Sequence, residues 1–445
     1  MEEPAYLSES QASGAEREDG PMSARVGQAR YPHRRIPLAL VFVALVAAGC
    51  AQRSSDNAPA GTPVVILVSF DGWRWDYDAK APAPNLRSLM ARGVRAEGLI
   101  PSFPSKTFPN HYTIVTGLYP GHHGIVANNI RDAATGRTFA PAKQEEVRDP
   151  MWWGGEPIWV RVQRAGQIAG SMFWVGSEAP IGGMLPRYTK AYDDDFPASD
   201  RVDQVLAWLD LPPAERPSFV TLYFSDTDSA GHDDGPESAA VRAAIARLDG
   251  HLGRLLRGLD TRGLTNRVNL VVVSDHGMAE VSVDRVVVLD DYISLDDVDI
   301  ADLNPTVGLF PKPGREEDVY RALVGAHPRL QVYRRDATPE RWHYRGHPRI
   351  PPVIGVVDEG WQVLSRRTVE GIRAGRIAAA AGQHGYDPAV MSMRGIFVAA
   401  GPAFRQGVTV PAFENVHLYT ALARVLGVPP ATNDGDPTVA GSLLQ

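Results

Sequence analysis

Residues 64–72 read Val-Val-Ile-Leu-Val-Ser-Phe-Asp-Gly, a nearly continuous apolar run that ends in an acidic residue and a glycine. Three later runs have the same apolar character, at residues 219–224, 269–274 and 395–400. Runs without polar alternation are typical of strands that a parallel sheet buries on both faces. Between them, apolar residues recur every three or four positions over 201–210 and 237–256, which predicts helices. Alternating strands and helices predict an α/β fold with a mostly parallel sheet flanked by helices.

The character of the sequence changes between about residues 280 and 380, where short apolar runs alternate with loops rich in Pro, Arg and Asp. We interpret this stretch as a loop-rich lobe inserted into the same unit. A chain of 445 residues could hold as many as three domains of roughly 150 residues. Because no internal repeat or low-complexity block follows residue 62, we expect a single domain over residues 63–445.

The composition excludes several classes of protein. Hydrophobic residues make up 44% and charged residues 22%, as is ordinary for a globular protein. The 45 Lys and Arg against 52 Asp and Glu give a net charge of −7, so no basic excess predicts a nucleic-acid-binding surface. A single cysteine rules out intramolecular disulfides and Cys-rich zinc or iron–sulfur sites.

That cysteine, Cys50, follows Gly49 and a short apolar run at residues 36–48, and the basic pair Arg34 and Arg35 precedes this run. A basic start, a short apolar run and small residues are the parts of a secretory signal. The small residues before Cys50 resemble a bacterial lipobox, in which the cysteine is lipidated. We therefore expect residues 1–50 to be a signal peptide with a lipobox, and the protein to be lipid-anchored to a membrane and to face the periplasm or cell envelope. The alternative is an ordinary signal peptide with an incidental cysteine, which would give a secreted protein.

The first 21 residues fit no signal, because they carry six acidic residues and one arginine. Starting at Met22 leaves a basic stretch before the apolar run, so we predict that Met22 is the true start. Residues 51–62 are small and polar, and we interpret them as a flexible tether.

Acidic and histidine residues follow three of the four apolar runs. Asp71 follows the first, Asp226, Asp228 and His232 follow the second, and Asp275 and His276 follow the third. In open parallel sheets the carboxyl ends of the strands line one crevice, where ligands bind. His384, which precedes the last run, adds another imidazole. Asp and His without Cys are the ligands of a catalytic zinc site. The four-residue spacing from Asp228 to His232 also suits a plain side-chain pair on a helical turn.

The most distinctive stretch, residues 101–124, brings the chain close to a known family. Its match begins at FDG (70–72) and continues with KTFPNHYTIVTGLYP (106–120), HGIVAN (123–128), EPIW (156–159), DSAGH (228–232), SDHGM (274–278) and HGY (384–386). In content and order these pieces closely resemble the nucleotide pyrophosphatase/phosphodiesterase family of the alkaline phosphatase superfamily. The resemblance spans residues 64 to roughly 400 and implies an alkaline-phosphatase-like core.

The resemblance also implies two zinc ions and a threonine nucleophile. It assigns Asp71, Thr107, Asp275 and His276 to one zinc, and Asp228, His232 and His384 to the other. Thr107 would attack phosphorus to form a phosphothreonine, and Asn128 would donate a hydrogen bond to a phosphoryl oxygen. Phe108 and Tyr223 resemble the aromatic pair that holds a nucleobase in nucleotide-cleaving relatives, although either ring could simply pack in the core. The expected partner is a small nucleotide or phosphodiester that yields a nucleoside 5′-monophosphate, and the oligomeric state is left open.

Several alternatives stay open at this point. A phosphomonoesterase, a phosphonate hydrolase or a phospholipid-headgroup phosphodiesterase of the same superfamily would share the metal site. Residues 102–106 (Ser-Phe-Pro-Ser-Lys) half-match a sulfatase signature, but Lys106 stands where that signature has arginine, and Thr107 follows it. A non-catalytic binding lipoprotein is the alternative outside enzymes.

Overall fold

The structure is a computed structural model that describes residues 62–445, which form one compact unit. The predictions for the signal peptide, Met22, Cys50 and the tether up to residue 61 lie outside the described residues. None of the helices within residues 62–445 is long and apolar enough to cross a membrane.

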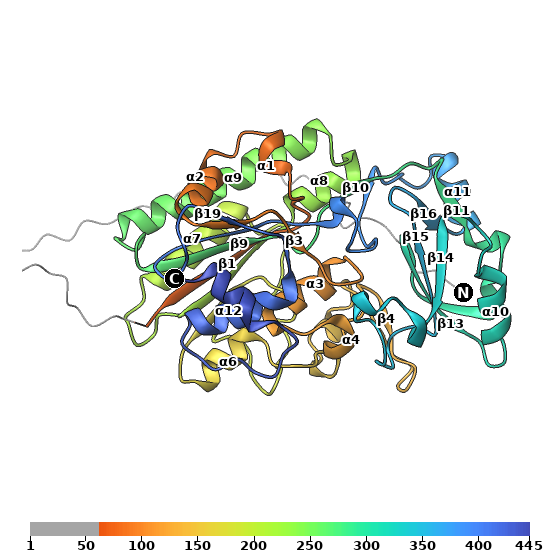
Figure 1. Cartoon of the computed structure of the whole chain (residues 1–445), viewed down its shortest axis with the longest axis horizontal. Coiled ribbons are helices and arrows are strands. Elements are labelled where there is room, and N and C mark those ends of the chain that lie inside the picture. The colour runs from red at the N-terminus through yellow and green to blue at the C-terminus, as the bar shows by residue number, and fades with distance from the viewer. Residues whose placement is uncertain (1–61) are drawn as a thin grey trace, which may run out of the picture. The chain divides into compact units, whose positions relative to one another are not determined.

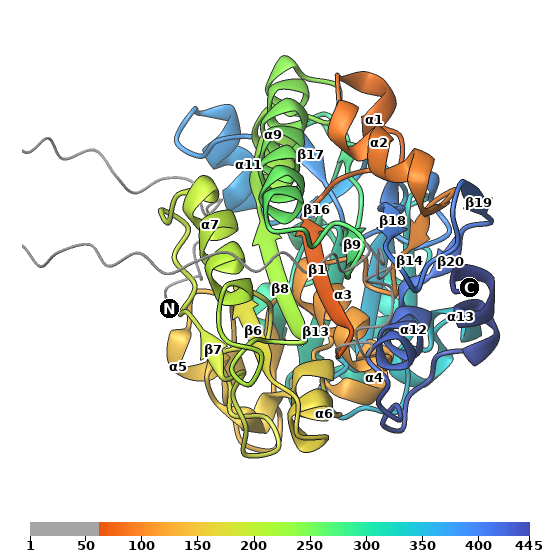
Figure 2. The same cartoon turned by 90° about the vertical axis from the view of Figure 1, so that its left-hand side faces the viewer.

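The main sheet has eight strands, and four central ones (β9, β1, β8, β6) run parallel (Figures 1 and 2). In spatial order the strands are β19 (Val408–Val410), β2 (Val94–Ala96), β18 (Phe397–Ala400), β9 (Val268–Val273), β1 (Val64–Phe70), β8 (Phe219–Phe224), β6 (Ala169–Met172) and β7 (Tyr188–Thr189). The prediction of a mostly parallel sheet is confirmed. For the run at 395–400 the expectation of a parallel strand is wrong, because β18 pairs antiparallel with both β9 and β2. An apolar run predicts burial on both faces but carries no information about strand direction.

Helices cover both faces of this sheet. Figure 2 shows α1 (Tyr77–Lys80), α2 (Pro84–Arg92), α7 (Ala198–Leu209) and α9 (Ala239–Thr261) on one side, and α8 (Asp226–Asp234), labelled in Figure 1, packs against α9. The other side carries α3 (Thr107–Thr116), α4 (Pro120–His123), α5 (Gln144–Val147), α6 (Ile158–Arg164), α12 (Leu418–Val425) and α13 (Pro437–Leu443). Successive residues of β1 point alternately to the two helix layers. Ile66 and Val68 pack against the layer of α2, α7 and α9, whereas Val65 and Leu67 pack against the layer of α3, α6 and α12.

The segment predicted as a lobe contains an antiparallel sheet of its own. Its strands lie in the order β12 (Val298–Asp302), β13 (Thr306–Pro311), β15 (Val353–Val357) and β14 (Leu330–Arg334), with α10 (Glu316–Leu323) packed against them. Short pairs connect it to neighbouring segments: β10 (Ala279–Glu280) with β17 (Gly382–Gln383), and β11 (Val286–Val288) with β16 (Gln362–Leu364), followed by α11 (Arg366–Arg373). Two further pairs are β3 (Leu99–Ile100) with β20 (Phe413–Glu414), and β4 (Ile130–Arg131) with β5 (Thr138–Phe139). Figure 1 shows the lobe strands beyond α3 and β10.

Arg349 joins this lobe to the α3 side of the core. Its buried guanidinium donates to the carbonyl oxygens of Trp152 at 2.7 Å and Met151 at 2.8 Å. It also pairs with Asp132 at 3.1 Å. Arg349 therefore fixes the lobe to the core, because its N–H groups donate to backbone carbonyl oxygens of the core.

Candidate active site

Three neighbouring strands of the main sheet end at the same level, which brings their following residues together. Ser69 of β1 lies opposite Tyr223 of β8 and Val273 of β9. Asp71 therefore lies beside helix α8 on one flank and the segment after β9 on the other. Gly72 makes the approach to α8 possible, because it has a φ of +65° and a Cβ there would lie 2.8 Å from the Cα of Asp228.

Four of the predicted site residues form a buried group around His276. The Nε2 atom of His276 lies 2.9 Å from Asp275 Oδ2 and 3.5 Å from Asp71 Oδ1. The hydroxyl oxygen of Thr107 lies 3.2 Å from the same nitrogen. Both carboxylates and His276 are almost fully buried, whereas Thr107 is half-buried. This group opens towards solvent on the side of Thr107.

The other three predicted ligands form a second, more open group. Asp228 and His232 lie one turn apart on α8, with Asp228 Oδ1 3.5 Å from His232 Nε2. His384 reaches the same oxygen at 3.6 Å from the segment after β17. The rings of His384 and His276 stack with centroids 3.5 Å apart, so the two groups are adjacent.

The orientation of the imidazoles indicates that this cluster accommodates cations. Each Nδ1 lies within hydrogen-bond distance of a backbone carbonyl oxygen: Gly382 for His232 (3.0 Å), Gly277 for His276 (2.9 Å) and Ser105 for His384 (2.9 Å). With Nδ1 donating, each Nε2 presents a lone pair to the carboxylates. Oδ1 of Asp71, Oδ1 of Asp228 and Oδ2 of Asp275 are buried and accept no hydrogen bond. Lone pairs that face buried carboxylate oxygens repel them unless a cation lies between, so these residues fit metal ions of the kind that take Asp and His ligands.

The pKa values of the buried groups are shifted because several titratable side chains lie close together away from water. Burial and the carboxylates of Asp275 and Asp228 raise the pKa of Asp71 well above its ordinary value. For His384, burial and then the neighbouring imidazoles lower the pKa well below the ordinary value, which keeps this ring neutral. A neutral ring is the form that binds a metal.

Thr107 is the first residue of α3, and the start of this helix faces the carboxylate cluster. The N-terminus of a helix carries a partial positive charge and unpaired N–H groups, which favours phosphate groups. The N–H of Phe108 donates to the side-chain oxygen of Asn128 at 2.9 Å. The structure thus places Asn128 beside the start of α3 with its oxygen engaged, which leaves the amide nitrogen as the group that can donate to a ligand.

The two predicted aromatic residues lie in different surroundings. Phe108 is half-buried, and its ring contacts Phe139 with centroids 5.6 Å apart. Tyr223 donates its hydroxyl to Oδ2 of Asp71 at 2.6 Å, a contact that the sequence does not predict. Next to it lies Tyr192, with ring centroids 6.0 Å apart and 38% of its surface exposed. Tyr223 therefore orients a carboxylate, and Tyr192 adds an exposed aromatic ring that the sequence reasoning missed.

His111 is another residue that the sequence reasoning missed. It is fully buried, one turn after Thr107 on α3, with Nδ1 3.0 Å from the Thr107 carbonyl oxygen and 3.3 Å from Asp275 Oδ2. Its Nε2 lies 2.8 Å from the Ser69 hydroxyl. The imidazole joins β1, the start of α3 and one carboxylate of the cluster. Its spacing of four from Thr107 was the available signal, because these positions share one helix face.

The half-matched sulfatase signature is not positioned for chemistry. Ser102 is buried, its hydroxyl donates to the side-chain oxygen of Asn415 at 3.0 Å, and its N–H donates to Asn110 at 2.7 Å. Thr107, and not Ser102, lies at the cluster.

Known proteins share this arrangement of sequence and fold. A sequence profile of the type I phosphodiesterase / nucleotide pyrophosphatase family matches residues 65–387. The chain belongs to this family. It is 35% identical over 395 residues to human ectonucleotide pyrophosphatase/phosphodiesterase family member 5, a match that covers 89% of this chain and 81% of the relative. It is 34% identical to the Xenopus laevis bis(5′-adenosyl)-triphosphatase enpp4, covering 86% of this chain and 82% of that protein.

Solved structures of family members have the same fold. Murine ectonucleotide pyrophosphatase/phosphodiesterase 5, as an inactive threonine-to-alanine variant in complex with AMP, aligns with a TM-score of 0.81 at 37% identity. The alignment covers 86% of this chain and 100% of the murine chain. The human counterpart aligns with the same TM-score and identity. The predicted α/β core and the family assignment are thereby confirmed.

Proposed function

We propose that this family member is a two-zinc nucleotide phosphodiesterase/pyrophosphatase that releases nucleoside 5′-monophosphates through a phosphothreonine intermediate. The observation that carries the proposal is the hydroxyl of Thr107, which lies at the start of a helix and 3.2 Å from His276, beside three carboxylates that each have one buried oxygen without a hydrogen bond. The relatives' names supply the reaction class, and the AMP in the murine complex supports a nucleotide product. That this murine variant is inactive after loss of a threonine supports a threonine nucleophile.

Seven side chains would hold the metal ions. Asp71, Thr107, Asp275 and His276 would hold one zinc ion, and Asp228, His232 and His384 the other. Bound zinc would stabilise the alkoxide form of a threonine hydroxyl and the negative charge on phosphoryl oxygens. The three carboxylates supply −3 against +4, which leaves a net attraction for an anionic phosphodiester.

The chain's own residues then perform a two-step substitution at phosphorus. The Thr107 hydroxyl loses its proton to solvent as its oxygen forms a bond to phosphorus; the bond to the leaving oxygen breaks, and the leaving group takes a proton from solvent. A water oxygen next attacks the phosphothreonine and loses a proton to solvent, the bond between phosphorus and the Thr107 oxygen breaks, the Thr107 oxygen takes up a proton, and the nucleoside 5′-monophosphate leaves. Throughout, the amide nitrogen of Asn128 donates to the phosphoryl oxygens, where charge accumulates, and the positive end of the α3 dipole lies beside them.

Replacing Thr107 with alanine tests this mechanism. Thr107→Ala removes the nucleophile, and we expect kcat to fall by at least about 1,000-fold, because the covalent route is lost. Zinc content, measured by atomic absorption, should stay close to two ions per chain, because six of the seven ligands remain. Activity equal to that of the wild type would overturn the mechanism, and a wild type with no turnover would favour a non-catalytic binding protein.

The substrate is tested by comparing kcat/KM for three chromogenic esters. p-Nitrophenyl thymidine monophosphate should be the best substrate, because the half-buried Phe108 and Tyr223, with the exposed Tyr192 beside Tyr223, offer aromatic surface to a base, and such stacking contributes about 1–3 kcal/mol. Faster turnover of p-nitrophenyl phosphate would instead favour a phosphomonoesterase, and of p-nitrophenyl phosphorylcholine a phospholipid-headgroup phosphodiesterase. Preferred hydrolysis of phosphonoacetate would favour a phosphonate hydrolase.

We also propose that Cys50 is lipidated and that the enzyme acts in the cell envelope. The support is the sequence alone: a basic start, a short apolar run and small residues before the cysteine. Metabolic labelling with a radioactive fatty acid should label the wild type and leave Cys50→Ser unlabelled. N-terminal sequencing of the unprocessed precursor tests whether translation begins at Met22.

A further inference from the structure

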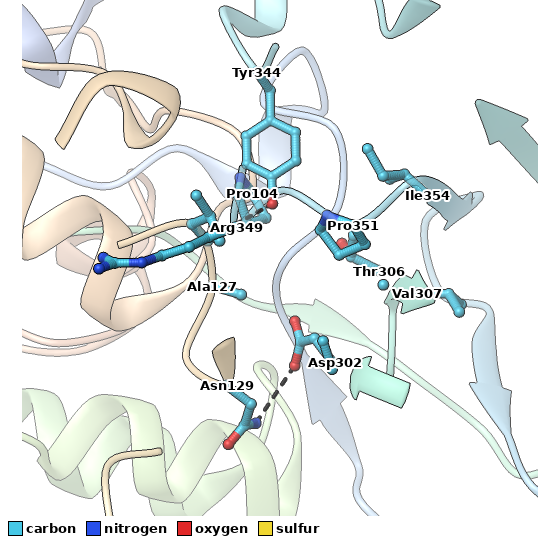
Figure 3. A pocket seen from close by; sticks show the side chains of 13 residues that line it. Pro104, Ala127, Asn129, Asp302, Thr306, Val307, Tyr344, Arg349, Pro351 and Ile354 are labelled. Carbon is cyan, nitrogen blue, oxygen red and sulfur yellow. Dashed lines mark hydrogen bonds between the residues drawn. The ribbon is translucent and has the colours of Figure 1, made fainter. Parts of the chain in front are cut away.

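A short turn of the lobe, residues 302–306, contacts three segments that carry predicted active-site residues. The turn links β12 to β13 and contains Asp302, Asn304 and Thr306. Figure 3 shows Asp302 and Thr306 of this turn in one pocket lining with Pro104 and Asn129. The contacts that it makes are with backbone or side chains next to the reactive residues, not with those residues themselves.

The first contact is a buried ion pair between Lys106 and Asp302. The Lys106 ammonium donates to Oδ2 of Asp302, and it also donates to the carbonyl oxygen of Asn304 at 3.2 Å. The side chains of Lys106 and Asp302 are 6% and 5% exposed, so the pair is shielded from water. Because two of its three donors are used inside the fold, the ammonium is not free to act as a ligand for substrate phosphate.

The second and third contacts reach the other two segments. Asn129 donates through Nδ2 to Oδ1 of Asp302 at 3.5 Å, the contact that Figure 3 marks. Thr306 donates its hydroxyl to the carbonyl oxygen of Gly385 at 2.6 Å. Gly385 has a φ of +113°, and a Cβ there would lie 2.9 Å from Cε of Lys106 and 3.0 Å from Cδ of Pro305. Lys106 and the turn therefore pack directly on Gly385.

Each contacted residue is the immediate neighbour of a residue with a proposed role. Lys106 precedes Thr107, Asn129 follows Asn128, and Gly385 follows His384. These three segments are far apart in the sequence, and the turn is a common support for all of them. A displacement of the turn would change the separations among the nucleophile, the amide and the imidazole together.

We propose that the buried Lys106–Asp302 ion pair is a positioning pair, through which the lobe holds Thr107 and Asn128 in register with His384. Its effect falls on the chemical step and not on substrate binding, since both charges are buried and paired with each other. The inference rests on the phosphodiesterase activity proposed above. The lobe would then influence the rate of the reaction, although the residues of its turn do not themselves touch the reacting atoms.

The test compares Asp302→Asn with a matched substitution in the same strand. Asp302→Asn leaves the buried Lys106 charge without its counter-charge, and we expect kcat to fall by about 10- to 100-fold, because small misplacements of reacting groups cost rates of that order. KM should change by less than about 3-fold, since transition-state positioning and not binding is lost. Asp299→Asn is the control: Asp299 lies in β12 and pairs with Lys312 and Arg131 in a more exposed position, so its removal should leave kcat unchanged.

A second variant keeps the test decisive if Asp302→Asn does not fold. The double variant Lys106→Met/Asp302→Leu removes both charges and keeps apolar volume, so it should retain the wild-type melting temperature. We expect its kcat to be reduced as well, because the link from the turn to Lys106 is gone. Wild-type kcat in the double variant would overturn the positioning role. So would an Asp302→Asn variant that has a lower melting temperature but an unchanged kcat. A change confined to KM would show instead that the pair acts in binding. Wild-type protein without turnover of any phosphodiester would overturn the proposed function and this inference with it.

Discussion

At the scale of single residues, the predicted site depends on groups that hold the ligands in place. The carbonyl oxygens of Ser105, Gly277 and Gly382 lie within hydrogen-bond distance of the Nδ1 atoms, an arrangement that places the Nε2 atoms towards the carboxylates. The Tyr223 hydroxyl does the equivalent for Asp71, and the His111 ring lies 3.3 Å from Asp275. Such outer contacts set the orientation and basicity of metal ligands.

Tyr223→Phe removes the hydroxyl that donates to Asp71 and keeps the aromatic ring. We expect zinc affinity, measured by competition with a chelator, to fall by about 10- to 100-fold, because an oriented carboxylate loses its hydrogen bond. Tyr188→Phe is the control, since that hydroxyl donates to the Glu215 carbonyl oxygen on the surface. Equal zinc affinity in both variants would contradict an orienting role for Tyr223.

His123 predicts a dependence of stability on pH. It is buried, accepts from the Ile125 N–H at 3.1 Å, and burial lowers its pKa from 6.5 to about 3. Between these values the unfolded chain binds one more proton than the folded chain, so stability is complete above 6.5 and is lost as pH falls towards 3. The loss is about 1.4 kcal/mol per pH unit. The free energy of unfolding in urea, measured from pH 6.5 to 4.5, should fall less steeply with pH in His123→Gln than in the wild type, by this amount per pH unit. The same pH dependence in both proteins would refute the prediction.

At the scale of helices and strands, the site depends on where α3 begins and on how tightly α8 approaches β1. Lys106 is extended, and Thr107 opens α3, which aims the helix start at the carboxylates. Gly72 allows α8 to lie against the end of β1. Neither feature is a ligand, yet both decide whether Asp71, Asp228 and Thr107 can meet.

A buried carboxylate provides a test at this scale. Asp249 of α9 accepts from the backbone N–H groups of Asn85 at 3.2 Å and Leu86 at 2.8 Å, and so satisfies the start of α2. Asp249→Ala leaves these donors unpaired, and we expect the free energy of unfolding in urea to fall by about 2–3 kcal/mol. Asp260→Ala, at an exposed position of the same helix, should change it by less than about 0.5 kcal/mol. Similar effects of both substitutions would show that the cap contributes little.

At the scale of the whole molecule, the metal cluster joins segments from most of the described chain. Its ligands follow β1, β8, β9 and β17, and Thr107 comes from α3. Without cations, the buried carboxylates of Asp71 and Asp275 and the neighbouring Asp228 repel one another at the centre of the fold. Cations bound by the predicted ligands would therefore stabilise the entire domain.

Removal of metal by a chelator should abolish activity and lower the melting temperature. At free zinc 1,000 times its Kd, binding would stabilise the folded state by about 4 kcal/mol per site. Adding zinc back should restore both activity and melting temperature, measured by calorimetry. Full activity after exhaustive chelation would contradict a metal-dependent mechanism.

The sequence by itself determined the family, the α/β core and the residue types of the site. These follow from local patterns: apolar runs that form buried strands, and acidic or histidine residues directly after them. It gave the wrong direction for β18, because an apolar run is the same in either orientation and only pairing with β9 and β2 sets the direction.

Only the tertiary structure decided how the ligands are held. The Tyr223 hydroxyl on Asp71, the place of His111 and the contact of Lys106 with Asp302 join residues that are far apart in the chain or buried by long-range packing. Their energies depend on desolvation and on distances of a few ångströms, and neither is encoded in the spacing of a motif. The motifs therefore supply the residues of the candidate site, and the packing of the lobe and helices against the sheet specifies where their side chains lie.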